Sequence, residues 1–283
     1  MPDGVWFADR QGIIRFWNKS AEAITGFTGS EVLGAPFRDI LSYCGETGVP
    51  ADIMPLRETL DQKVERHAQM FLRHKQGHRI AVELETMPVR SATGEMIGAR
   101  EIIRESKDIP ALVRRRRMLE QHGLWDSKIE SASEEYMRKQ LEVRLEHFHA
   151  DNIATGAILI QIDNMQDRDR KMGHEAADQL LRMVSRTTLL CVRFTDIAGR
   201  WGDDSILAIL EAASIDNLTI SAERIRALIS ASSIRWWGAV VQITVTIGCS
   251  MFQPQDTAGL LMDRLKTSVD AGAQAGGHRV LTA

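Results

Sequence analysis

The sequence predicts an α+β protein with two domains joined by a helical linker. Its 283 residues suit two domains of ordinary size. The first hundred residues alternate short β-rich runs with turns, whereas the last part of the chain alternates strand and helix patterns. A charged, largely helical stretch separates them. We therefore expect domains at 1–106 and 151–283, with 107–150 as linker and as the start of the second domain.

The composition is typical of a soluble globular protein. Hydrophobic residues make up 44% and charged residues 26% of the chain, and the net charge of −3 implies no bulk attraction to nucleic acid or membrane. The start MPDGVWFADR shows no secretory signal, and no apolar run is long enough to cross a bilayer. The three cysteines lie far apart, which fits reduced thiols. We expect a cytoplasmic protein.

The first region predicts an antiparallel sheet flanked by short helices. The runs GVWFAD and GIIRFWN are β-rich, and a hairpin signal at 10–12 separates them. Short helices are expected to open at Ser20 and Ser30 and to stop at Gly26 and Gly34. The runs HRIAVELETMPVR and MIGAREIIRE predict two later strands joined by a turn.

These pieces and their spacing resemble a PAS domain over nearly the whole region. The segments with the greatest similarity are DGVWFADRQGIIRFWNKSAEAITGF and HKQGHRIAVELETMPVRSATGEMIGAREII. The resemblance implies a domain that senses a signal or dimerises. The residues indicate no particular ligand for it, so the PAS ligand is left open.

The linker predicts a helix that pairs with a second copy. Apolar residues seven apart suit a short two-helix seam. These pairs are Leu112 and Leu119, Met118 and Trp125, and Ile129 and Tyr136. We expect a homodimer formed through the first domain and this helix.

The last region predicts strands alternating with helices. GAILIQI predicts a buried strand, GHEAADQLLRMVSRTTLL a helix, and AGRWGDDSIL a β-hairpin. A second helix is expected with Ser221 as its N-cap, and a last helix over about 257–274. VQITVTIGCSM alternates apolar and polar residues, as a half-buried strand does.

This order of elements resembles the GGDEF domain of bacterial diguanylate cyclases, which join two GTP molecules into cyclic di-GMP. The matching segments are QIDNMQDRDRKMGHEAADQLL, VRFTDIAGRWGDD, AERIR, ITVTIG and GGHRV. The resemblance implies a central, mostly antiparallel sheet surrounded by helices. It also implies that GTP and Mg²⁺ are bound only if the domain is active.

The residues that would hold the metals depart from the family pattern. Joining two nucleotides is a phosphoryl transfer, which needs divalent ions held by carboxylates. The resemblance assigns one carboxylate to an Asp-x-Asp motif, where Gln161 stands first and Asp163 second. It assigns the other to the signature loop, where Asp204 matches. An amide oxygen is a poor ligand for Mg²⁺, so Asp163 and Asp204 are interpreted as a remnant metal site.

Other contacts that the resemblance implies are altered as well. In the remnant loop Gly202-Asp203-Asp204-Ser205, Asp203 stands for a glycine and Ser205 for a glutamate. The two phosphate cations become Ala273 and Gly277, and only Asp126 survives of an entrance motif. Of the two guanine contacts, Asp169 replaces an asparagine and Asp178 matches. No catalytic residue is therefore assigned, and turnover is expected to be lost.

One binding motif is kept. Arg193 and Asp196 form an Arg-x-x-Asp pair, which in the family is the inhibitory site for cyclic di-GMP. Arginine can bind the edge of guanine through two hydrogen bonds, and aspartate can accept from its N–H groups. Arg224 matches a further arginine of that site, although a solvated helix residue is an equal interpretation.

The sequence therefore predicts a PAS sensor coupled to a degenerate GGDEF domain that binds cyclic di-GMP. An active cyclase under PAS control, with Asp163 as the substitute ligand, is the first alternative. A protein-interaction scaffold that binds no nucleotide is the second. The downstream protein and the process regulated are not encoded in any pattern of the sequence.

Overall fold

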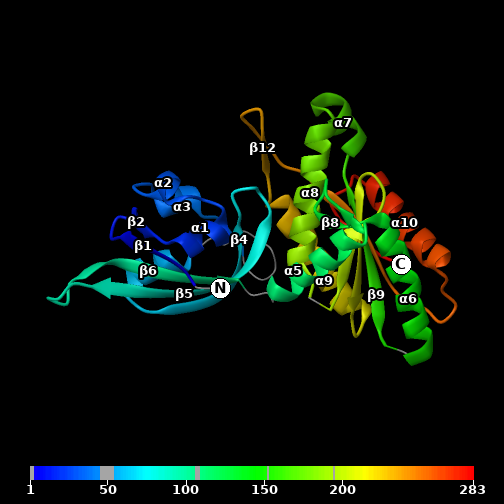
Figure 1. Cartoon of the computed structure of the whole chain (residues 1–283), viewed down its shortest axis with the longest axis horizontal. Helices are drawn as coiled ribbons and strands as arrows, with labels where there is room; N and C mark the ends of the chain where they lie inside the picture. Colours follow the sequence, from blue (N-terminus) through cyan, green and yellow to red (C-terminus); the bar gives the residue numbers. More distant parts are fainter. Residues whose placement is uncertain (1–2, 45–53, 106–108, 152, 194) are drawn as a thin grey trace. The chain divides into compact units, whose positions relative to one another are not determined.

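The chain forms two compact units, residues 1–107 and 108–283, in a computed structural model (Figure 1). The structure describes residues 3–44, 54–105, 109–151, 153–193 and 195–283, and the side chains of these residues except 109–114. Within the described ranges, no helix combines the length and the apolar character that a bilayer-spanning segment requires.

The first unit is a six-stranded antiparallel sheet with four short helices. The strand order is β2-β1-β6-β5-β4-β3, and β5 and β6 form a long hairpin. The strands are β1 (Gly4–Asp9), β2 (Ile14–Trp17), β3 (Tyr43–Cys44), β4 (Arg66–Arg73), β5 (Arg79–Arg90) and β6 (Met96–Glu105). The helices are α1 (Lys19–Thr25), α2 (Gly29–Val32), α3 (Phe37–Ile40) and α4 (Pro55–Gln62).

The starts of the first two helices differ from the sequence prediction. Asn18, not Ser20, caps α1, and its side chain accepts from the N–H of Ala21 at 2.8 Å. The same oxygen accepts from the N–H of Val5 at 2.9 Å, so this cap also ties the helix to β1. Thr28, not Ser30, begins α2 in a capping box with Glu31.

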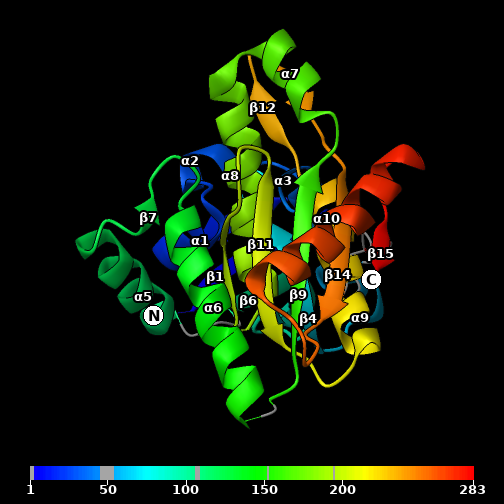
Figure 2. The same cartoon turned by 90° about the vertical axis from the view of Figure 1, so that its right-hand side faces the viewer.

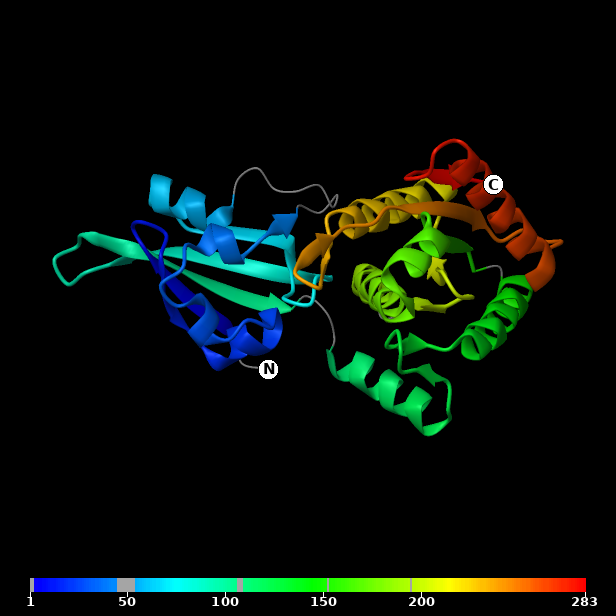
Figure 3. The same cartoon turned by 90° about the horizontal axis from the view of Figure 1, so that it is seen from above.

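The second unit is a mostly antiparallel seven-stranded sheet with helices on both faces. The strand order is β15-β14-β9-β11-β10-β8-β7. Helices α6 and α10 cover one face, and α8 and α9 cover the other (Figures 2 and 3). This architecture confirms the predicted α+β class.

Its elements follow in chain order. The strands are β7 (Trp125–Asp126), β8 (Ser131–Ala132), β9 (Thr155–Ile162), β10 (Ile197–Arg200), β11 (Ser205–Glu211), β14 (Val245–Met251) and β15 (Val280–Thr282), beside the separate hairpin of β12 (Ile234–Trp236) and β13 (Ala239–Val241). The helices are α5 (Ile109–Gln121), α6 (Glu134–Asp151), α7 (Met165–Met172), α8 (His174–Cys191), α9 (Ile215–Ser230) and α10 (Ala258–Gln274).

Two expectations for this unit are wrong. Helix α9 begins after Ser214, which caps it, so Ser221 lies inside the helix and its hydroxyl donates to the carbonyl of Asn217 at 3.0 Å. The strand expected to be half-buried is buried on both faces over most of β14. It lies between β9 and β15, with helices α9 and α10 packed against it, so its one threonine, Thr246, is buried against α10 rather than exposed to water.

The seven-residue pattern of the linker does not form a continuous helical seam. Trp125 and Ile129 lie outside the helices, in and after β7, because the chain turns back between α5 and α6. Leu119 is 1% exposed in the core of its own unit, where it cannot face a partner helix. The side chain of Leu112 lies outside the described residues. This basis for dimerisation is therefore wrong, and dimerisation itself stays a prediction.

Candidate functional site

The loop between β10 and β11 is a tight hairpin tip, as the sequence predicts. Gly202 has φ of 92°, a left-handed conformation that a side chain disfavours. The N–H of Trp201 donates to the carbonyl of Ser205 at 2.9 Å, and the Ser205 hydroxyl donates back to the Trp201 carbonyl. Ser205 thus closes the base of the loop, and the side chain of Asp203 is fully exposed at its tip.

Two side chains from distant segments hold this tip in place. Arg200 donates to the carbonyl of Gly202 at 2.8 Å and to the carboxylate of Asp126 at 2.9 Å. Glu134, from the start of α6, accepts from the N–H of Gly202 at 3.1 Å. Burial alone would raise the pKa of Asp126, but Arg200 and two backbone donors outweigh it and lower that pKa. Arg200 and Glu134 were missed in the sequence, although Arg200 sits beside the signature loop.

Gln161 and Asp204 face each other across β9 and β11. Gln161 is paired with Ser205 in the strand register, and its Nε2 donates to Asp204 Oδ2 at 3.1 Å. The Ile162 N–H also donates to the backbone carbonyl of Asp204 at 3.1 Å. The carboxylate that the resemblance assigns to a metal therefore receives a side-chain amide instead.

Asp163 binds the segment near the C-terminus that contains His278, and it also binds Thr246 of β14. Its Oδ1 accepts from the Thr246 hydroxyl at 2.6 Å, and its Oδ2 accepts from the N–H of His278 at 3.0 Å. A Cβ placed on Gly277 would lie 3.0 Å from Oδ1, so only a glycine fits there without displacing Asp163. Each oxygen of this carboxylate thus accepts one hydrogen bond from a protein donor.

This donor set does not fit a pair of divalent metals. Mg²⁺ requires near-octahedral coordination by oxygen atoms. Here Asp204 is paired with an amide N–H, and the Asp163 oxygens accept two protein hydrogen bonds. The described residues also contain no group of three or more His, Cys, Asp or Glu side chains placed to hold a metal.

The two residues assigned to guanine lie on neighbouring helices. Asp169 is on α7, and its carboxylate lies 2.6 Å from Nδ1 of His174 at the start of α8. Asp178 is half-buried one turn further along α8. The distance brings Asp169 close to this histidine, but its buried Oδ1 forms no hydrogen bond of acceptable geometry with the described residues.

The Arg-x-x-Asp pair forms the connection between α8 and β10. Asp196 is only 3% exposed, and its carboxylate accepts from the N–H of Arg193 at 2.7 Å and from the N–H of Glu211 at 3.3 Å. Burial raises the pKa of Asp196, although these backbone donors and the charge of Arg193 oppose the shift. The side chain of Arg193 is exposed and forms no hydrogen bond with the described residues. Asp196 shapes the loop, and Arg193 is presented to solvent.

Three further arginines donate to carbonyls of this loop, whose described residues 191–193 and 195–196 we call the Arg193 loop. Arg224 of α9 donates to Cys191 at 2.9 Å. Arg144 of α6 donates to Thr195 at 2.9 Å, and Arg115 of α5 donates to Asp196 at 2.8 Å. The Nε of Arg224 is buried and has no partner among the described residues. Arg115 and Arg144 were missed because no sequence spacing links α5 or α6 to this loop.

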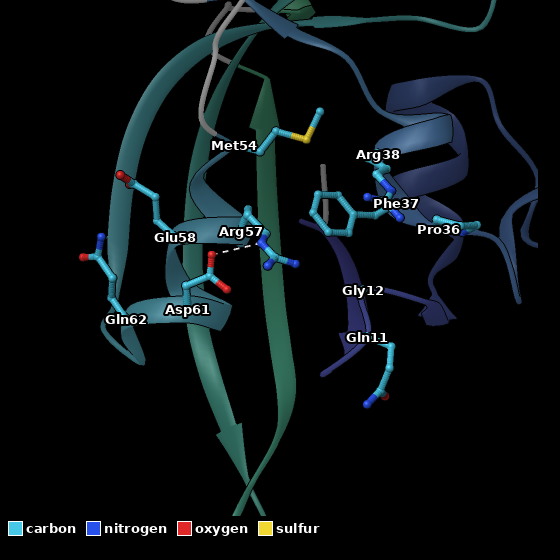
Figure 4. A pocket seen from close by; sticks show the side chains of 10 residues that line it. All are labelled: Gln11, Gly12, Pro36, Phe37, Arg38, Met54, Arg57, Glu58, Asp61 and Gln62. Carbon is cyan, nitrogen blue, oxygen red and sulfur yellow. Dashed lines mark hydrogen bonds and ion pairs between the residues drawn. The ribbon is translucent and has the colours of Figure 1, made fainter.

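The first unit contains a pocket of about 570 Å³ between the β1–β2 turn, α3 and α4 (Figure 4). Phe37 and Met54 face it, and Arg57 forms an ion pair with Asp61 at 2.9 Å on its rim. The remaining lining residues are polar or small: Gln11, Gly12, Pro36, Arg38, Glu58 and Gln62. The mixture of apolar and oppositely charged groups indicates no single ligand class.

A carboxyl group is buried in the core of the same unit. Oε1 of Glu101 accepts from the Tyr43 hydroxyl at 2.5 Å and from Nε1 of Trp6 at 3.1 Å. Its Oε2 is buried and has no partner among the described residues. Burial raises the pKa of Glu101 from 4.5 to about 7, against the opposing effect of the two donors.

Comparison with known proteins agrees with this architecture. The family described as "Diguanylate cyclase, GGDEF domain" matches residues 130–279, and the PAS fold matches residues 1–104. The coiled coil and GGDEF domain of DgcB from Caulobacter crescentus, solved in complex with c-di-GMP, superposes with a TM-score of 0.54 at 20% identity. That match covers 61% of this chain and 93% of the DgcB chain, and it shows the shared fold.

Curated relatives are longer than this chain. The probable diguanylate cyclase DgcE of Escherichia coli K12 is 23% identical over 269 residues, which is 94% of this chain but 24% of DgcE. Diguanylate cyclase A of Treponema denticola is 28% identical over 124 residues, or 44% of this chain and 33% of that protein. The chain thus spans about a quarter to a third of these relatives. With over half of its residues matched by the family, this chain belongs to the GGDEF family and carries a PAS domain ahead of the GGDEF domain.

Proposed function

We propose that this chain is a receptor for cyclic di-GMP in which the GGDEF domain binds the dinucleotide at the Arg193 loop and does not convert GTP. The PAS domain supplies the signal input. The proposal concerns the activity and ligand of this chain, and it builds on its membership of the diguanylate cyclase family.

The hydrogen bond from Gln161 to Asp204 is the observation that supports the loss of turnover. It pairs one remaining carboxylate with an amide donor, while Asp163 is committed to Thr246 and His278. The exposed carboxylate of Asp203 adds a charge of the same sign as the phosphates.

The concentration of guanidinium groups supports the binding of a dianionic dinucleotide. Arg193 presents an exposed side chain, and Arg224, Arg144 and Arg115 donate to the same loop. Arginine binds phosphate and the edge of guanine through paired hydrogen bonds, and it stacks on bases. Because Asp196 is buried, its contribution is to hold the loop that carries Arg193.

Two assays on the full chain test the proposal. Incubation with GTP and either Mg²⁺ or Mn²⁺ should produce no cyclic di-GMP above a control without protein. Calorimetric titration with cyclic di-GMP should show binding. Turnover that Asp204→Ala abolishes would establish the active cyclase instead, and absence of both turnover and binding would establish the scaffold.

We also propose that the chain dimerises through its PAS domain. Because the linker forms no continuous helical seam, the support for dimerisation comes from two exposed apolar side chains, Phe16 of β2 and Ile97 of β6. Sedimentation of the full chain should give a dimer that Phe16→Glu weakens. A parent chain that sediments as a monomer would contradict this proposal.

A further inference from the structure

We propose that Arg115 couples the linker helix α5 to the ligand site, so that occupancy of the Arg193 loop and docking of α5 stabilise each other. This inference rests on the proposed binding of cyclic di-GMP and assigns a regulation to that same site.

The geometry places Arg115 on the residue that also fixes the binding arginine. Its Nη1 donates to the backbone carbonyl of Asp196 at 2.8 Å. The carboxylate of that same Asp196 accepts from the N–H of Arg193 at 2.7 Å. A displacement of α5 would therefore disturb Asp196 directly and Arg193 through it.

Helix α5 is held on the domain by few other described contacts. Leu119 is buried in the core, and the guanidinium of Arg116 lies 5.3 Å from the centre of the Trp125 ring. Arg116 otherwise pairs with Glu120 on the exposed surface, which contributes little. The bond from Arg115 is thus a substantial part of the polar attachment described for α5, and α5 is the segment that leads from the PAS domain.

Charge gives the coupling its sign. The Arg193 loop gathers Arg115, Arg144, Arg193 and Arg224. Arg144 is paired with Glu211 at 3.1 Å, and the buried acid of the loop, Asp196, is already engaged by backbone donors. A ligand with two phosphates would offset the repulsion among these guanidinium groups and so stabilise the docked position of α5. Linkage is reciprocal, so a PAS state that pulls α5 away must weaken binding by the same factor.

Titration of the full chain with cyclic di-GMP, combined with hydrogen exchange of α5, tests the coupling. Arg115→Ala should weaken binding about fivefold, near the lower end of ordinary allosteric couplings, and Arg115→Lys should weaken it less. Arg117→Ala is the matched control, because it removes the same charge from an exposed position of the same helix. In the parent and in Arg117→Ala, ligand should slow exchange of the amides at 115–121. In Arg115→Ala, it should not.

The outcomes separate this inference from the proposed function. A parent chain that binds no cyclic di-GMP would overturn both. A parent that binds, with Arg115→Ala of equal affinity and with ligand-protected α5 amides, would overturn the coupling alone. If Arg115→Ala unfolds, Arg115→Lys is tested instead by its affinity for cyclic di-GMP and by hydrogen exchange of α5. Lysine keeps the positive charge but has one nitrogen donor in place of the guanidinium group.

Discussion

Gln161 donates its side-chain amide to the carboxylate of Asp204 over 3.1 Å, across two neighbouring strands at the centre of the GGDEF sheet. A pair of carboxylates at these positions would repel each other unless a cation lay between them. With an amide on one side, the pair is stable by itself. At the positions that the family resemblance assigns to metal, this hydrogen bond thus links β9 to the residue that precedes β11.

The first prediction concerns Gln161→Asp. The change should place two carboxylates in contact and lower the free energy of unfolding by roughly 1–3 kcal/mol, through lost hydrogen bonding and like-charge repulsion. The variant should still make no cyclic di-GMP with Mg²⁺ or Mn²⁺, because Asp203, Ser205, Ala273 and Gly277 are unchanged. Gln161→Ala is the control, since it removes the bond without adding charge. Turnover by Gln161→Asp, or a melting temperature raised selectively by Mg²⁺, would show that a metal site persists.

The second prediction concerns the ion pair of Arg200 with Asp126, whose side chains are 19% and 17% exposed. Asp126→Asn should destabilise the domain by about 1–3 kcal/mol, because a largely buried arginine loses its partner. Asp203→Asn provides the comparison, since Asp203 lies 3.5 Å from the same Arg200 but is fully exposed. That change should stay within about 0.5 kcal/mol in urea unfolding. Equal losses of unfolding free energy in Asp126→Asn and Asp203→Asn would contradict the assignment of Asp126 as the stabilising partner of Arg200.

The pH dependence of the same pair has a definite sign. The pKa of Asp126 is lowered in the folded state, so its stabilisation is present above the unfolded pKa and is lost as the pH falls. Asp126→Asn should therefore lose less stability than the parent on acidification. Urea unfolding at successive acidic pH values measures the difference.

The third prediction concerns Glu101 in the PAS core. Its pKa is raised to about 7, so the folded state holds this proton more tightly than the unfolded chain. Its contribution to stability is therefore greatest at low pH and declines as the pH rises from about 4.5 through about 7. Because Glu101→Gln cannot titrate, its melting temperature should fall less than that of the parent between about pH 5 and about pH 8. Calorimetry at several pH values gives the slope of melting temperature against pH for the parent and for Glu101→Gln. Parallel slopes would contradict the prediction.

Local sequence patterns correctly predicted the helices and strands whose bounds do not depend on tertiary contacts. The hairpin around Gly202 and the strand at β9 follow from turn residues and apolar runs in the sequence. The start of α9 was missed because Ser214 and Ser221 are equally good caps locally, and the packing of the whole helix decides between them. The linker was misjudged because seven-residue spacing in the sequence carries no information on where the chain turns back.

The candidate site shows the same division. The sequence resemblance proposes positions such as Asp163, Asp204 and Arg193, and their assignment to a site stays a prediction. Their partners could not be identified from the sequence, because His278 reaches Asp163 across 115 residues and Arg115 reaches Asp196 across 81. Such contacts depend on the folded sheet and on the docking of α5, for which the sequence has no periodic signal.

The measurement that tests the central claim most directly is a calorimetric titration of Arg193→Ala with cyclic di-GMP, beside the parent and Asp204→Ala. The parent should bind with a Kd on the order of micromolar, about −8 kcal/mol. Arg193→Ala should lose roughly 1–3 kcal/mol, because a paired contact with guanine is removed, while Asp204→Ala should bind like the parent. Equal affinity of Arg193→Ala and the parent, or no heat from the parent at near-millimolar ligand, would contradict the account.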